Sequence, residues 1–207
     1  AMSTAQLSRL NTLQLSLLDT NQINGLSTRQ MAALTTTQIA ALTSDQLNNL
    51  GSDNLRALST TQIQALTTWQ LSHLVTLQVV LIETRDIAAF TTAQAAALSS
   101  DGVAALTTAQ AKALTTDQIE SLTTDQAKAL TSAQLNALTS TQVGAIETED
   151  LAAMTTTQIG GFATTQIKAM NTADLGILTT VQLTGLTSTG LGALAATAPI
   201  SQPRSPH

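Results

Sequence analysis

An eight-residue period is the feature of this sequence that most constrains how the chain can fold. A large apolar residue recurs at every eighth position from Met2 to Leu194, 25 times in succession without one insertion or deletion. A strict internal period of this kind is typical of repeat architectures, in which each unit buries its apolar side against its neighbours. The sequence therefore predicts a single octapeptide-repeat solenoid over residues 1–194.

Within each octad the residues follow a consensus, L-T-T-x-Q-I-x-A, whose positions are numbered here from the leucine. Position six is apolar throughout, position three is Ser or Thr in all 24 octads, and position five is Gln in 18 of the 24. Positions four and seven vary and hold most of the charge, as at Asp117 and Lys112. We therefore expect positions four and seven to face solvent and the large apolar residues to face a common axis.

The second position of each octad carries the signal for a helix start. It is Ser, Thr, Asn or Asp in 19 of 24 octads, and these residues cap helix N-termini. The Gln three residues later completes a capping box, as in Thr35 and Gln38, and Leu34 and Ile39 have the spacing of a hydrophobic staple. Each octad is therefore predicted to begin a new helix.

A single continuous helix does not fit this period. Eight residues exceed two turns of a 3.6-residue helix by about 80°, so the leucine stripe would wind around the surface. We predict instead an all-α solenoid of very short capped helices, one per octad, which only stacking can stabilise. The alternative is a β-solenoid with octads as half-coils, since Thr, Ile and Val favour strands. Against it, Gly and Asn recur at no fixed position, and Ala, Gln and Leu favour helices.

The two ends of the chain differ from the array. Residues 195–207 contain all three prolines and are predicted to be a linker or frayed tail. The start of the chain lacks the charged and apolar regions of a signal peptide, and Ala1 and Met2 are interpreted as a cloning remnant on an excised piece. No distinct capping repeat precedes Met2, so we expect either a longer natural array or ends that meet end to end.

Composition narrows the classes of partner. The chain has no cysteine, so it has no disulfide and no thiolate metal site. A net charge of -5 lacks the basic footprint of a nucleic-acid binder. The longest purely aliphatic run, 79–82, is far shorter than the roughly 18 residues of a membrane span. We expect neither a nucleic-acid partner nor membrane insertion.

Acidic residues are the first candidates for a site. The candidates are Glu83, Asp86, Glu147, Glu149 and Asp150. A calcium site would need several oxygen ligands that converge on one point, usually with a glycine turn, and no such turn accompanies these residues. We therefore expect them to be cap and first-turn carboxylates. The acidic residues at position two, Asp19, Glu83 and Glu147, recur at every eighth octad. This spacing indicates either a higher-order repeat of eight octads or the history of duplication.

Other unusual residues suggest no chemistry. His73 has no evident metal-binding partner and is interpreted as a tolerated substitution, Trp69 is expected to be exposed, and Phe90 and Phe162 are expected in the core. No Ser/His/Asp set can be assembled from distinctive residues. We therefore predict no catalytic, cofactor or metal site, and we do not expect an enzyme.

The tandem pattern L-T-T-x-Q-[IL]-x-A-L, as in 106–114 and 130–138, resembles the repeat regions of very long Gram-negative surface proteins described as haemagglutinin-like or RTX-type adhesins. The resemblance covers residues 2–194 and carries no active-site residues across. The glycine-rich calcium nonapeptides that accompany such proteins are missing here. The resemblance implies an extracellular or cell-surface spacer, filament or adhesive stalk.

Three functions remain open on the sequence. A structural module, self-associating end to end or laterally, is favoured by the regularity of the array and its low charge. Rows of threonine at positions two and three could bind ice or a glycan. Variable positions four and seven could recognise a protein partner, as in other helical repeats.

Overall fold

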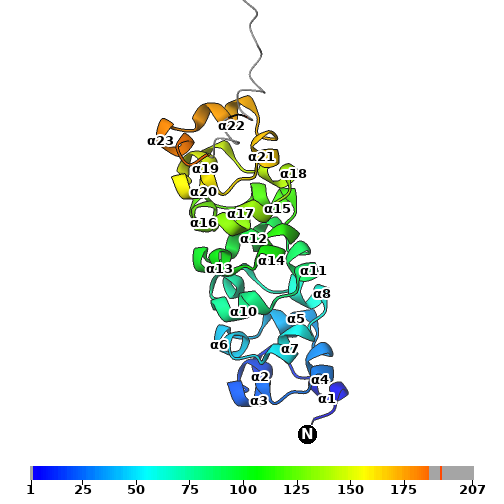
Figure 1. Ribbon diagram of the computed structural model, residues 1–207. Coiled ribbons are helices and arrows are strands. Elements are labelled where there is room, and N and C mark those ends of the chain that lie inside the picture. The colour runs from blue at the N-terminus through cyan, green and yellow to red at the C-terminus, as the bar shows by residue number, and fades with distance from the viewer. Residues whose placement is uncertain (1, 187–191, 193–207) are drawn as a thin grey trace, which may run out of the picture.

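The computed structural model describes residues 2–186 and 192, and over these residues the chain is a stack of short helices without a strand. Figure 1 shows the helices following one another from the amino terminus upward. There is one helix per octad, which confirms the predicted all-α solenoid and not the β-solenoid alternative. The predicted boundary at residue 194 and the tail over 195–207 lie outside the described residues.

The helices are four to six residues long and are spaced regularly along the chain. Their bounds are α1 Thr4–Leu7, α2 Thr12–Ser16, α3 Thr20–Asn24, α4 Thr28–Ala32, α5 Thr36–Ala40, α6 Ser44–Asn48, α7 Ser52–Arg56, α8 Thr60–Gln64, α9 Thr68–Ser72, α10 Thr76–Leu81, α11 Thr84–Ala88, α12 Thr92–Ala97, α13 Ser100–Ala105, α14 Thr108–Ala113, α15 Thr116–Glu120, α16 Thr124–Ala129, α17 Ser132–Ala137, α18 Ser140–Val143, α19 Thr148–Ala153, α20 Thr156–Gly160, α21 Thr164–Ile167, α22 Thr172–Ile177 and α23 Thr180–Leu183.

Where the second position holds a capping residue, the helix begins directly after it, as the sequence predicts. In α5 the hydroxyl of Thr35 accepts a hydrogen bond from the Gln38 backbone N–H, and the Gln38 side chain accepts one from the Thr35 N–H. Positions one and two are both extended between helices, as at Leu98 (φ -58, ψ 140) and Thr35 (φ -72, ψ 158). Two extended residues per octad therefore end one helix and reorient the chain for the next.

Among the described helices α1 to α23, five lack a side-chain cap, and they are the five whose second position holds none of the four expected capping residues. These positions are Gly51, Val75, Glu83, Glu147 and Ala163. The expectation that the two glutamates are cap carboxylates was therefore wrong. Glutamate is not among the residues that cap well, since its carboxylate is one methylene further from the backbone than that of aspartate. Asp19 does cap α3.

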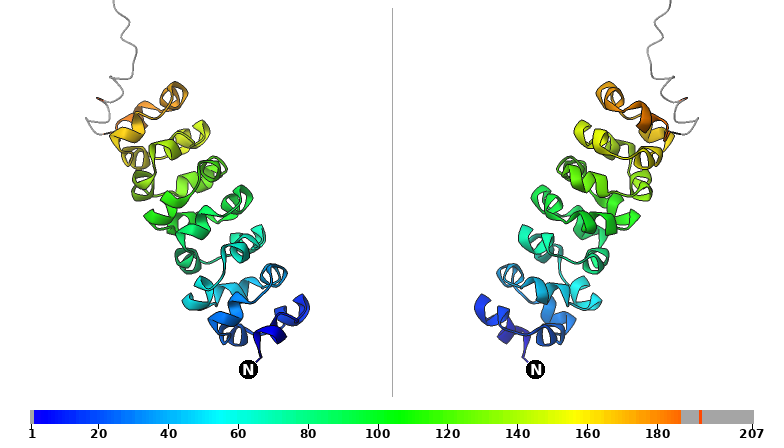
Figure 2. Two further views of the ribbon diagram at one scale, coloured as in Figure 1. Left: turned by 90° about the vertical axis from the view of Figure 1, so that its right-hand side faces the viewer. Right: turned by 90° about the vertical axis from the view of Figure 1, so that its left-hand side faces the viewer.

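Successive turns of the solenoid stack because helices pack on the helix three octads later, as α14 on α17 and α20 on α23. Figure 2 shows the resulting elongated stack from two sides. Hydrogen bonds between turns most often join positions 28 apart, as Gln38 to Leu10, which corresponds to about three and a half octads per turn. The recurrence of acidic octads at every eighth octad is therefore not a whole number of superhelical turns.

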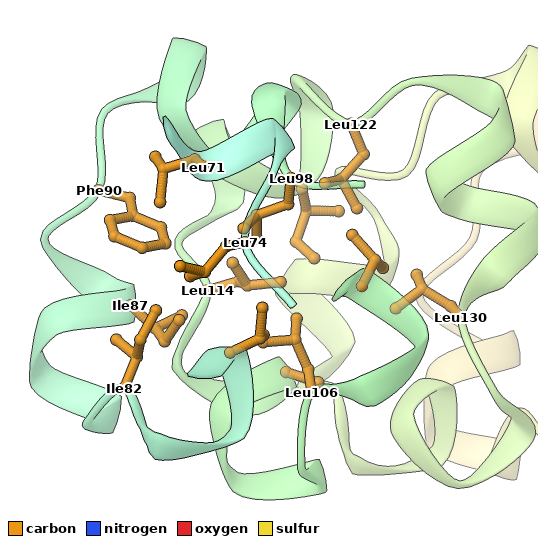
Figure 3. Packing of buried hydrophobic residues seen from close by; sticks show 14 of the residues in the cluster. Leu71, Leu74, Ile82, Ile87, Phe90, Leu98, Leu106, Leu114, Leu122 and Leu130 are labelled. Atoms are coloured by element: carbon orange, nitrogen blue, oxygen red, sulfur yellow. The ribbon is translucent and has the colours of Figure 1, made fainter. Parts of the chain in front are cut away.

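The core is one continuous column of the apolar residues at positions one and six. Ile39 is 0 % and Leu42 is 2 % exposed, and the same pattern runs from Leu7 to Leu186. Figure 3 shows leucines and isoleucines from several turns meeting, with Phe90 in the place of a leucine. Phe90 and Phe162 are buried as predicted. The apolar faces of helices too short to be stable alone are thus covered only by stacking.

Candidate functional site

The glutamine at position five is the side chain that joins one turn to the next. Gln38 is buried, and both its amide oxygen and its amide nitrogen form hydrogen bonds. The Oε1 atom accepts from the Thr35 N–H at 2.9 Å, while Nε2 donates to the backbone oxygens of Leu7 at 2.9 Å and Leu10 at 2.8 Å. The same link to a carbonyl 28 residues earlier is made by Gln46, Gln62, Gln70, Gln78, Gln94, Gln110, Gln118, Gln126, Gln134, Gln142, Gln158, Gln166 and Gln182.

This set of buried amides, called the glutamine ladder below, was not anticipated from the sequence. A capping box accepts either Gln or Glu at its last position, yet the chain has no Glu at position five. That absence was the available signal. A carboxylate could accept from the cap N–H but could not donate to the carbonyls of the previous turn. Buried polar groups need partners, and an amide at this position provides them for both the cap N–H and the carbonyls of the previous turn.

Shorter side chains at position five keep part of this link. Asn54 donates through Nδ2 to the backbone oxygen of Leu26 at 2.9 Å, again 28 residues earlier. Asp86 accepts from the Thr60 hydroxyl at 2.6 Å, and Asp174 accepts from the Thr148 hydroxyl at 3.1 Å. Open surface hollows of ≈ 370 and ≈ 390 Å³ are lined in part by Asn54 and by Asp174.

The acidic octads at α11 and α19 differ in the neighbours of their buried aspartates. Asp86 lies 3.7 Å from the Nε of Arg85, which also pairs with Glu83 at 2.9 Å. Burial raises the pKa of Asp150, a hydrogen bond from Thr124 opposes that rise, and the charge of Glu149 adds to it. Within residues 2–186 and 192, no three carboxylate or imidazole groups come together to hold a metal ion.

Two consecutive helices, α9 and α10, carry a group of exposed side chains that is mostly apolar. It comprises Trp69, His73, Val75, Leu77 and Val80, called the apolar cluster below. Trp69 is 58 % and Leu77 is 68 % exposed. The rings of Trp69 and His73 are stacked with centroids 4.3 Å apart, and His73 Nδ1 lies 2.8 Å from the Trp69 backbone oxygen. Trp69 is exposed as expected, and the stack pairs two residues that sequence reasoning had treated separately.

None of the helices in the described part of the chain combines the length and the hydropathy needed to cross a lipid bilayer.

Capped one-helix units around a single column, linked turn to turn by amides, define a repeat protein of the helical solenoid class. Six segments of the sequence match the ALTTAQ repeat, at residues 24–52, 39–76, 79–116, 105–132, 112–145 and 143–173. These segments span most of the array, and the chain belongs to the ALTTAQ repeat family. No curated protein matches the sequence.

Proposed function

We propose that this chain is a structural module, a spacer or stalk segment of a secreted or surface-exposed bacterial protein. The observation that carries the proposal is the unbroken column of core residues from Leu7 to Leu186, with buried amides locking turns to those before them. Such a body gains length with each octad without changing its cross-section, as Figure 2 illustrates. The proposed role needs no catalytic group.

Resistance to bending follows from how the turns are joined. The Nε2 of each ladder amide, which carries two hydrogens, lies within hydrogen-bonding distance of two or three backbone oxygens of the previous turn, as in Gln134 with Val103, Ala104 and Leu106. Sliding one turn over the next would leave buried donors and acceptors unpaired, which costs about 1–3 kcal/mol for each group. A stack with many such links is suited to hold two parts of a protein at a fixed separation.

Self-association is a further part of the proposal. Gln6, Gln14 and Gln22 are exposed, in contrast to the buried glutamines of later octads. A turn from a second copy of the chain could accept hydrogen bonds from these three amides in the register that Gln38 shows. We also propose the adhesin and cell-surface role, which rests on the resemblance of the repeat alone.

Small-angle scattering combined with sedimentation velocity tests this function. A rigid spacer predicts an elongated monomer with the dimensions of the stack, at every concentration measured. A filament segment predicts particles that lengthen with concentration while their cross-section stays constant. A flexible or compact monomer would contradict both forms of the proposal.

A protein-binding surface is the second candidate function, and the apolar cluster favours it. Three of its five side chains are large aliphatic residues at positions that are polar or small in most octads: Val75, Leu77 and Val80. Replacing Trp69 and Leu77 by Ala and Thr respectively should leave the fold intact and abolish capture of a partner if this surface binds one. A threonine surface for ice or glycan would rely on position three, because cap hydrogen bonds engage the hydroxyls at position two.

A further inference from the structure

Two kinds of departure from the octad consensus, one at position seven and one at position two, occur at a fixed spacing along the sequence. Across the 24 octads, Asn occupies position seven only at Asn24, Asn48 and Asn136. Glycine or an apolar residue replaces the capping residue at position two only at Gly51, Val75 and Ala163. Each of these three residues belongs to the fourth octad after the one that holds an asparagine, in the order in which they are named.

The structure places two of the asparagines directly on the helix start that has lost its cap. The Oδ1 of Asn24 accepts from the Gly51 N–H at 2.8 Å, and the Oδ1 of Asn48 accepts from the Val75 N–H at 3.0 Å. Asn48 also donates through Nδ2 to the His73 backbone oxygen at 2.8 Å. Both asparagines therefore bind backbone one turn further along the stack, at the uncapped residue.

The third asparagine makes only part of this contact. Asn136 donates through Nδ2 to the Gly161 oxygen at 3.1 Å, as Asn48 does to His73. The Ala163 N–H still donates to the Gln166 side chain, at 2.6 Å. An asparagine from the previous turn therefore accepts from the position-two N–H at Gly51 and at Val75. In the Ala163 octad the asparagine contacts only the Gly161 oxygen, two residues before Ala163.

The backbone N–H at position two explains why the asparagine matters there. In a regular octad this N–H donates to the Gln side chain, as Thr67 does to Gln70. The Gly51 octad has Asn54 in place of that Gln, and its N–H donates to the previous turn instead. In the Val75 octad the N–H is likewise held from the previous turn, and the Oε1 of Gln78 is buried without a partner in the described structure.

We propose that Asn at position seven is a positioning residue: it holds the position-two N–H from the previous turn, in place of the position-five side chain of that octad, where Gly51 or Val75 stands four octads later instead of a capping residue. The cap hydroxyl acts within one octad, whereas the asparagine acts from the previous turn. The replacement therefore couples the start of a helix to the register of the stack. A polar Asn that fixes register has a parallel in coiled coils.

This exchange leaves position two free to carry an apolar side chain on the surface. Val75 is 45 % exposed and belongs to the apolar cluster. Asn48 contacts the backbone on both sides of Leu74, at His73 and Val75. The second candidate function above would therefore depend on Asn48, although the positioning role itself does not depend on any partner.

A double-mutant cycle between Asn48 and Val75 tests the proposal in the full chain. Asn48→Ala should lower the melting temperature by about 2–4 °C, the scale of one lost cap in a chain of this size. Val75→Thr restores a capping hydroxyl in an isosteric side chain, so Asn48→Ala should cost less in that background. Equal losses in the two backgrounds would overturn the proposal.

Amide hydrogen exchange gives a second readout that general destabilisation cannot imitate. In Asn48→Ala, protection of the Val75 amide should fall about tenfold more than that of Leu74, which donates to Leu71 within its own helix end. Asn48→Asp keeps the acceptor, so the Val75 amide should stay protected while the contact with His73 is lost. Loss of Val75 protection in Asn48→Asp as large as in Asn48→Ala would contradict the assignment.

Transplantation to a regular octad keeps the proposal testable if the Asn48 variants fail to fold. Thr115→Ala removes a cap, and position seven of the octad that lies four octads earlier is Ala88, which is exposed. Ala88→Asn should recover part of the melting temperature lost in Thr115→Ala and have little effect with Thr115 present. No recovery would count against the rule, and equal gains in both backgrounds would show an unrelated stabilisation.

Discussion

The octads of α11 and α19 have the same residue at six of eight positions, yet they treat the same buried carboxylate differently. Both place an aspartate where the ladder has glutamine, and both provide a threonine hydroxyl from the previous turn. At position four α11 has Arg85, within 3.7 Å of Asp86, whereas α19 has Glu149. Burial and the charge of Glu149 raise the pKa of Asp150. The two octads thus place opposite charges at position four beside the same buried carboxylate.

The largest change in unfolding free energy should come from placing a carboxylate in an octad that has a ladder glutamine. Gln118 donates to the backbone oxygens of Ile87 at 3.0 Å and Phe90 at 2.7 Å. Gln118→Glu keeps the shape and sets a charge against these two oxygens, so unfolding free energy at neutral pH should fall by about 3 kcal/mol. Urea denaturation followed by far-UV circular dichroism measures this. Unchanged stability would show that the ladder amides contribute nothing as donors.

The second prediction converts α19 into a ladder octad. Asp150→Asn removes a buried charge and supplies an amide that can reach the oxygen of Leu122 in the previous turn, as Asn54 reaches Leu26. We expect a gain of about 1 kcal/mol in unfolding free energy. Asp86→Asn is the matched control, and it should gain less because it also loses the Arg85 contact. An equal gain in unfolding free energy in both variants would show that Arg85 and Glu149 do not affect the two buried aspartates differently.

The difference should also depend on pH. Because the folded-state pKa of Asp150 is raised above its usual 3.8, the folded state binds the proton more tightly than the unfolded chain. The destabilisation is fully present above the folded-state pKa and disappears as pH falls toward 3.8. The stability advantage of Asp150→Asn over the wild type should therefore shrink between pH 7 and pH 4. A constant gap across that range would argue against a charged Asp150.

The smallest effect should follow from exchanging the solvent-facing residue. Glu149→Arg gives α19 the charge arrangement of α11 and should lower the pKa of Asp150. An exposed ion pair contributes little, so we expect about 0.5 kcal/mol of stabilisation. Glu149→Gln controls for removal of the negative charge alone and should give about half of that. Chemical shifts of the Asp150 carboxyl during an NMR titration report the pKa directly.

Much of the fold could be predicted from the sequence because its determinants are local. The capping residue and the Gln three positions later fix each helix start within one octad. The sequence alone therefore indicates which octads have a capping residue and which do not. The number of octads per turn could not be predicted, because it depends on how the side chains at positions one and six pack between turns. The inter-turn roles of Gln38 and Asn48 were missed for the same reason, since the partners of both side chains belong to a neighbouring turn.

Stacking at a non-integral number of octads per turn has a consequence for how such a gene can change. Because every ladder amide finds equivalent backbone oxygens, the loss or gain of one whole octad restores the ladder after a single rotation of all later units. Length can then vary in steps of one octad of coding sequence. The asparagine pairs are different, since an octad inserted between Asn48 and Val75 would move them out of register. The asparagine contacts would therefore disfavour insertion or deletion of octads between their two partners.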